Sequence, residues 1–164
     1  MSDFITPAEA KARGFDPATV SQYETIERAR EEALQLIPEI EVAFEGVPRP
    51  QTTLSVAKGY DDEWDLSAER IEELRSRDPE SVWQDVPDQS MEARQEYFTF
   101  SDPPGWLFYL PAFMCHYLRN FPDDGWDAVY QACQRKTHFD LLNEAQIQCV
   151  DSFLELCGRH QLRR

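Results

Sequence analysis

Four cysteines and three histidines are the residues of this chain best suited to nucleophilic or metal chemistry. Cys115 and His116 are adjacent on a predicted helix, so their side chains diverge by about 100° and cannot form a catalytic dyad. Cys157 and His160 lie three residues apart at the C-terminal end of another predicted helix, where the helix dipole disfavours a thiolate. A metal at this pair would need two further ligands from distant segments. We therefore predict reduced, buried thiols with no cofactor, and a metal site at Cys157 and His160 stays an open alternative.

An acidic stretch offers a second kind of site. Places 1, 3, 5, 7, 9 and 12 of a twelve-residue segment are occupied by Asp61, Glu63, Asp65, Ser67, Glu69 and Glu72, as in a calcium-binding loop. The sixth place is Leu66, however, where the sharp turn of such a loop requires glycine. We interpret the same residues as the acidic face of a helix over 62–75.

Acid–base catalysis would need a carboxylate or histidine whose pKa is shifted by apolar surroundings. Asp102, Asp140 and His116 are the candidates, although Asp102 is explained equally well as a helix cap. The sequence contains no Walker loop, no G-x-S-x-G and no H-E-x-x-H. An unrecognised small hydrolase is the alternative function, and it would require a pocket beside Tyr97, Tyr109 or His116.

The segment that must organise these residues is the aromatic stretch 97–121. Between Trp106 and Leu118 it is apolar on every side except at His116, which is typical of a helix buried all round. Asp102 and Pro103 form a helix start, and Pro111 predicts two kinked pieces, 103–109 and 111–121.

The remaining pattern is helical as well. Helix starts are predicted at Thr6-Pro7-x-Glu9, at Asp16-Pro17 and at Asn143-x-x-Gln146. The predicted helices include a long one from residue 23 that breaks or kinks near Pro38, then 62–75, 91–98 with Ser90 as its cap, 123–134 with Asp123 as its cap, and 143–160. Residues 51–58 are the only plausible strand and are more simply interpreted as an extended loop. We predict an all-α, compact bundle of about six or seven helices around a buried aromatic helix, with at most one short strand, in a single domain over 1–164.

Part of the chain resembles a known family. The sequence FTFSDPPGWLFYLPAFMCHYL, the closing FDLLNEAQIQCVDSFLEL and the earlier IEVAFEGVPRP are similar to a family of small bacterial domains of unknown function. Its most distinctive residues here are Tyr109 to Ala112, the YLPA helix start. The resemblance covers most of residues 36–157 as a family-like core and leaves residues 1–30 as an N-terminal extension. It implies a fold and no activity.

Charge excludes several functions. The formal net charge is −15, and residues 61–96 alone hold 13 acidic and 4 basic side chains, a local net of −9. Binding to nucleic acid or to an anionic membrane surface requires clustered Lys and Arg, so neither is expected. No apolar run of the ~20 residues needed to span a membrane is present. The first residues lack the pattern of a secretory signal, so we expect a cytoplasmic protein.

The acidic stretch favours a protein–protein interaction module of the immunity or regulatory type, because a concentrated charge steers a basic partner at long range. Acidity that serves only solubility is the competing interpretation. An exposed Trp within a charged rim would act as a binding hot spot. We expect a non-enzymatic monomer or dimer with a basic protein as partner. The predicted partner-binding residues are Asp61, Asp62, Glu63, Trp64, Asp65, Glu69, Glu72 and Trp83.

Overall fold

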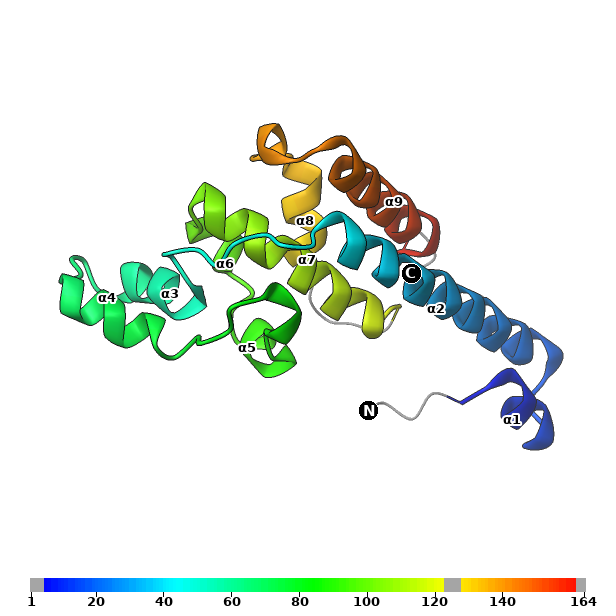
Figure 1. The fold of residues 1–164 in the computed structure, drawn as a ribbon. Helices are drawn as coiled ribbons and strands as arrows, with labels where there is room; N and C mark the ends of the chain where they lie inside the picture. The colour runs from blue at the N-terminus through cyan, green and yellow to red at the C-terminus, as the bar shows by residue number, and fades with distance from the viewer. Residues whose placement is uncertain (1–4, 123–127, 162–164) are drawn as a thin grey trace.

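Helices make up the regular structure of the chain (Figure 1). The computed structural model describes residues 5–122 and 128–161, and no strand occurs within these ranges. The α-helices are α1 (Pro7–Ala12), α2 (Pro17–Ala43), α3 (Leu54–Asp62), α4 (Ala68–Arg75), α5 (Asp88–Glu92), α6 (Tyr97–Phe100), α7 (Pro103–Arg119), α8 (Ala128–Arg135) and α9 (Glu144–Gln161). Two 3₁₀ turns, Trp83–Asp85 and Phe139–Leu141, complete the set. The all-α prediction is confirmed. The described part holds more helices than predicted because the stretch before α7 divides into short ones.

Helix α7 forms the centre of the core. It is buried along nearly its whole length, and its Phe108, Leu110 and Met114 have no exposed surface. The predicted start is confirmed, since the Asp102 carboxylate accepts a hydrogen bond of 2.8 Å from the Gly105 amide. The predicted division at Pro111 is wrong, because α7 continues through this residue. Burial on all sides outweighs the one backbone hydrogen bond that proline removes.

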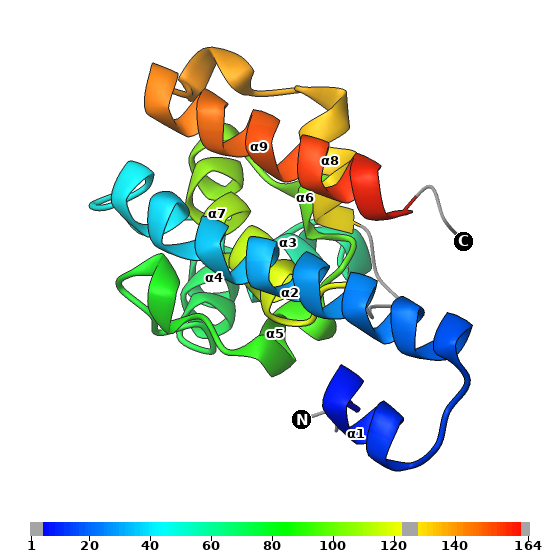
Figure 2. The same ribbon diagram turned by 90° about the vertical axis from the view of Figure 1, so that its right-hand side faces the viewer.

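Helices α2 and α9 pack against each other as an antiparallel pair (Figure 2). The Gln146 side chain at the start of α9 donates a hydrogen bond of 3.1 Å to the Ala43 carbonyl at the end of α2. At the opposite end, His160 lies 3.1 Å from the Glu32 carboxylate. Helix α2 runs without a break through Pro38, so the predicted break is also wrong. Pro38 lies on the exposed side of the helix, where it does not disturb the buried contacts.

Residues 54–75 form the α3–α4 unit, which lies at one end of the molecule (Figure 1). Of the extended loop expected at 51–58, residues 54–58 are instead the start of α3, and the helix expected over 62–75 begins only at Ala68. A small separate cluster of Val56, Leu66 and Leu74 holds the two helices together. Gly59 allows their close approach, since a Cβ there would lie 2.5 Å from Leu74 Cδ1. The apolar alternation of 51–58 therefore reflects burial within a helix pair.

Most helix starts agree with the sequence. Thr6 and Glu9 form the predicted capping box, Asp16 caps α2, and Asn143 and Gln146 exchange hydrogen bonds at the start of α9. Ser90 does not cap a helix over 91–98, because it lies inside α5. The predicted cap at Asp123 lies outside the described residues, and the helix expected to follow it is described as α8 from Ala128 onward.

Candidate functional site

The α3–α4 unit carries most of the predicted partner-binding residues in its helices and in the connecting segment 63–67. Within that segment Trp64 is fully exposed, with a relative exposure of 104%. Its neighbours explain this position: Glu63 is tied to Arg70 by an ion pair of 3.1 Å, and Leu66 is buried in the small cluster. With the chain anchored on both sides, the indole ring is presented to solvent.

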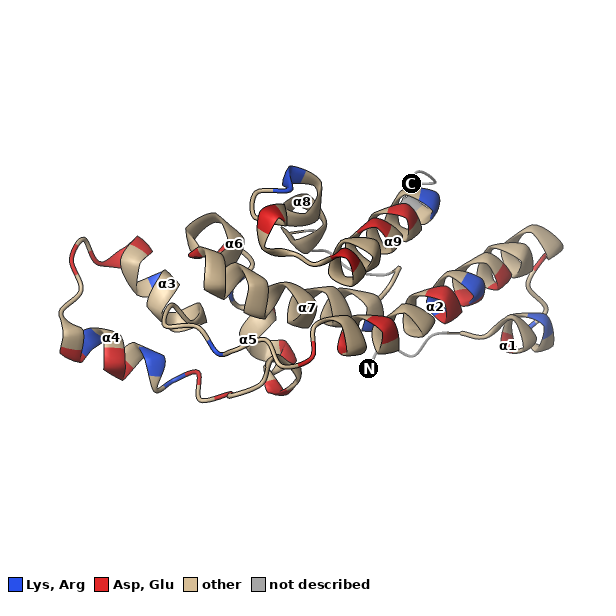
Figure 3. Cartoon of the chain, turned by 45° about the horizontal axis from the view of Figure 1, so that its top comes forward, with Lys and Arg blue, Asp and Glu red and all other residues tan. Residues whose placement is uncertain are grey.

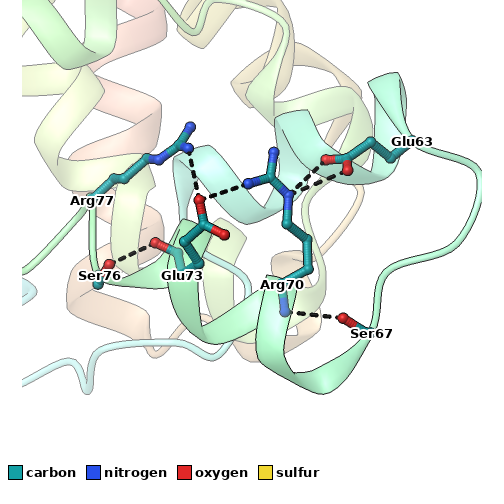
Figure 4. Close-up of polar contacts among 6 residues, drawn as sticks. All are labelled: Glu63, Ser67, Arg70, Glu73, Ser76 and Arg77. Atoms are coloured by element: carbon teal, nitrogen blue, oxygen red, sulfur yellow. Dashed lines mark hydrogen bonds and ion pairs between the residues drawn. The ribbon is translucent and has the colours of Figure 1, made fainter.

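Ion pairs cross-link much of the acidic surface on the α3–α4 unit (Figure 4). Arg70 contacts Glu63 at 3.1 Å and Glu73 at 2.9 Å, and Arg77 contacts the same Glu73 oxygen at 3.3 Å. The hydrogen bonds from these two carboxylates raise the pKa of the Arg70 guanidinium. Lys58 forms ion pairs with Asp61 and Asp62 in the same way. The negative charge of three of the six predicted acidic residues, Asp61, Asp62 and Glu63, is therefore partly neutralised.

Three predicted carboxylates stay unpaired. Asp65, Glu69 and Glu72 are exposed, and within the described residues none of them has an ion-pair or hydrogen-bond partner. Asp65 follows Trp64 directly, while Glu69 and Glu72 lie on α4. An exposed ring followed directly by the unpaired carboxylate of Asp65 matches a cationic side chain, since the ring face attracts a cation and the carboxylate adds charge.

Trp83 corrects the prediction, because it is 3% exposed and does not lie on the surface. Its indole N–H donates a hydrogen bond of 2.9 Å to the Phe44 carbonyl at the end of α2. Trp83 therefore joins the segment after α4 to the main core, and a partner has no access to its ring.

The thiols occupy the core as predicted. All four cysteines are free and buried. Burial raises the pKa of the Cys115 thiol to about 12 and also raises the pKa of Cys133 and Cys149. Such thiols are poor nucleophiles at neutral pH. Among the described residues, no group of three or more His, Cys, Asp and Glu side chains is arranged to hold a metal ion.

The residues of the alternative enzyme are engaged in structural contacts. The Tyr97 hydroxyl donates a hydrogen bond of 2.8 Å to the Thr52 carbonyl. The ring of Tyr97 packs against that of Tyr109, with 4.7 Å between the ring centroids. Burial raises the pKa of both tyrosines, which keeps them protonated. His116, at the edge of the core, lies 3.0 Å from Asp88, which also accepts a hydrogen bond of 2.7 Å from Arg119.

The two carboxylates considered for acid–base work also have simpler roles. Asp102 caps α7, and Asp140 is exposed in the 3₁₀ turn after α8. Neither side chain is buried in the core.

A second surface feature escaped the sequence interpretation. A shallow groove of about 540 Å³ runs between α2 and α9. We call it the α2–α9 groove, and its walls are Pro38, Glu39, Val42, Ala43, Ala145, Gln148, Cys149 and Ser152. The available signal was the absence of any Lys or Arg from residues 31–45 and 144–158. That signal gains meaning only when the two segments are known to lie side by side.

Comparison with models of protein families finds a match over most of the chain. A model described as "Family of unknown function (DUF6714)" matches residues 32–163. No curated protein and no solved structure matches the chain. Within the described residues, no helix has both the length and the apolar composition needed to cross a membrane.

Proposed function

The chain belongs to DUF6714, a family of unknown function, and we propose from its surface that it is a non-enzymatic interaction module that binds a basic protein. The α3–α4 unit is the proposed contact surface. The protein would act as a single cytoplasmic domain, monomeric or dimeric, in an immunity or regulatory role.

Trp64 is the observation that supports this proposal. Large aromatic residues dominate the energetics of protein interfaces, and a Trp that a partner buries is a typical hot spot. A fully exposed indole has no stabilising role in the free protein that would account for its position. Its segment is also held in place by the Glu63–Arg70 ion pair and by Leu66, so binding would cost little ordering of the chain.

The charges around Trp64 indicate the chemistry of the partner. Asp65, Glu69 and Glu72 are exposed and without partners in the described part of the chain. Asp61 and Asp62 share a single Lys58. An arginine stacked on the indole would satisfy both the ring and these carboxylates, since guanidinium groups stack on aromatic faces and pair with carboxylates. The surface therefore supports a partner that presents Arg side chains.

The proposal is tested by affinity capture from a lysate of the source organism at low salt, with bound proteins quantified by mass spectrometry. Trp64→Ala should lose a specific basic protein, and Asp65→Lys combined with Glu69→Lys and Glu72→Lys should lose the same one. Leu141→Ala, which removes another exposed apolar side chain far along the sequence, should retain it. Capture that is equal for wild type and Trp64→Ala would remove the support for this surface.

A further inference from the structure

The α2–α9 groove has an apolar floor that the protein leaves uncovered. Val42 is 76% exposed although it lies on a helix that packs into the core on its other side. Pro38 and Ala145 are also exposed beside it, and Cys149 lines the base of the groove. The floor therefore offers apolar contact area to an occupant.

The rim of this groove is acidic without compensation. Glu39 lines the groove itself. The segments 33–45 and 144–158 that border the groove contain no Lys, Arg or His, and they add Glu45, Glu144, Asp151 and Glu155. Glu41 lines a separate small pocket with Arg119 and is not part of this rim. In the described part of the chain, none of the five carboxylates on the bordering segments has an ion-pair or hydrogen-bond partner. In Figure 3 the charged positions of α9 are red until blue appears near its C-terminal end, whereas blue and red alternate on α4. The nearest basic groups on α9, Arg159 and His160, are already paired with Glu32.

We propose that the α2–α9 groove is a second docking site and that its occupant is a basic amphipathic helix of a partner protein. Two neighbouring helices with an apolar groove between them are the usual receptor for the apolar face of a third helix. The lining residues of α9 span 145–152, about 10 Å or two helical turns. An occupant would thus place two apolar side chains in the groove and its Lys or Arg side chains toward the acidic rim.

Charge complementarity selects this occupant over two others. A second copy of the chain would bring its own net charge of −15 toward the same acidic rim, and like charges oppose such an association. An anionic membrane surface is repelled for the same reason. A cationic helix is attracted by the rim and covered on its apolar side by the floor.

This inference does not depend on the proposed function, because the α3–α4 unit contributes no residue to the groove. The probe is a synthetic amphipathic peptide of about 14 residues, or four helical turns, with Leu at i, i+3, i+4 and i+7 and Lys elsewhere. Binding is measured by fluorescence anisotropy at low salt and mapped by amide chemical shifts in the full chain. We expect shifts concentrated at residues 38–43 and 145–152, and no binding of the same peptide with Glu in place of Lys.

Matched variants make the test specific. Val42→Lys should weaken binding about 10-fold or more, and Ala145→Lys on the opposite wall should do the same, because a charge enters the apolar floor and reduces the attraction. Leu34→Lys is the control, since Leu34 is also exposed on α2 but does not line the groove. It should change the affinity less than about 3-fold through distant charge alone.

Each other outcome counts against the proposal. If Val42→Lys and Leu34→Lys weakened peptide binding equally, the loss of affinity would be explained by net charge and not by the groove. If the Glu peptide bound as tightly as the Lys peptide, the acidic rim would have no role in binding. A loss of peptide binding in Trp64→Ala, with shifts at residues 54–75, would place the site on the α3–α4 unit and overturn the proposal. Circular dichroism of each variant confirms that the helices are retained.

Discussion

The α3–α4 unit and the α2–α9 groove are both acidic, yet they use their carboxylates differently. In the α3–α4 unit Lys58 and Arg70, together with Arg77 just beyond it, form ion pairs with four acids, Asp61, Asp62, Glu63 and Glu73. Along the groove the five bordering carboxylates have no such partners within the described residues. The stretch with the largest local charge is therefore not the surface with the least compensated charge.

The two regions also differ in how they are supported. The groove is built on the longest helices, whose inner faces belong to the main core, whereas the α3–α4 unit relies largely on a small cluster of its own. We expect the groove to be as stable as the whole protein and the α3–α4 unit to open more readily, because local stability follows local burial. Three predictions test this difference, and a fourth concerns an ion pair outside both regions.

The largest effect is expected beneath the groove. Phe153 of α9 is fully buried and packs against Tyr117 of α7, with 5.5 Å between the ring centroids. Phe153→Ala should lower the free energy of unfolding by about 3–5 kcal/mol through lost burial and a cavity. Chemical denaturation measures this, with the partly buried Leu154→Ala as a milder control. A loss below about 1 kcal/mol would show that the α2–α9 pair is not part of the cooperative core.

The next effect is expected in the small cluster. Leu74→Ala should cost about 2–4 kcal/mol, the range for a buried leucine. Hydrogen exchange should accelerate at residues 54–75 while amides of α2 and α9 keep their protection, because the α3–α4 unit has its own cluster. Equal acceleration in both regions would contradict the separation of the two.

A smaller effect is expected where the α3–α4 unit is closed by Asp78. This residue is buried, and its carboxylate accepts hydrogen bonds from the Ser55 amide at 2.7 Å and from the Ser55 hydroxyl at 3.1 Å. Asp78→Ala should therefore cost about 1–2 kcal/mol, as for the loss of a helix cap. Thermal unfolding measures it, and exposed Asp85→Ala is the control with little expected change.

The smallest effect concerns a paired carboxylate outside both regions, and it depends on pH. Burial would raise the pKa of Asp88, but hydrogen bonds from Arg119 and His116 outweigh it and hold this pKa below the ordinary value of 3.8. The stabilisation is thus present above about pH 3.8 and is lost as the pH falls through the lowered value.

Asp88→Asn measures the same contribution. It should lower stability by less than about 1 kcal/mol at pH 7, because the pair is half exposed and screened by solvent. The difference from wild type should shrink as the pH falls below about 3.8. Glu39→Gln on the groove, whose carboxylate has no partner among the described residues, should differ little from wild type over the same pH range. A difference for Asp88→Asn that persists at low pH would contradict the assigned pairing.

The sequence predicted best what depends on a few adjacent residues. The start at Thr6, the cap at Asp102 and the exchange between Asn143 and Gln146 use side chains within three residues of the amides they bind. The central aromatic helix was also predictable, since a segment that is apolar on every side must be buried. The helix breaks predicted at Pro38 and Pro111 do not occur, because tertiary packing determines whether a helix continues.

The candidate site was predictable only in part. Trp64 and Trp83 both lie in acidic sequence, and nothing local distinguishes them. Trp64 is exposed because Glu63 and Leu66 anchor the chain on either side, while Trp83 is buried because its N–H reaches the Phe44 carbonyl 39 positions earlier. In the same way, the tertiary structure determines which carboxylates form ion pairs with Arg70 and Arg77 and are thereby neutralised.

By itself the sequence determined the helical class, the buried centre and the negative charge, because composition and short-range periodicity specify these properties. The tertiary structure decided which indole faces solvent, which acids stay unpaired and that Val42 and Ala145 share one groove. These outcomes depend on contacts between residues far apart in the chain, and such contacts exist only after the helices have packed.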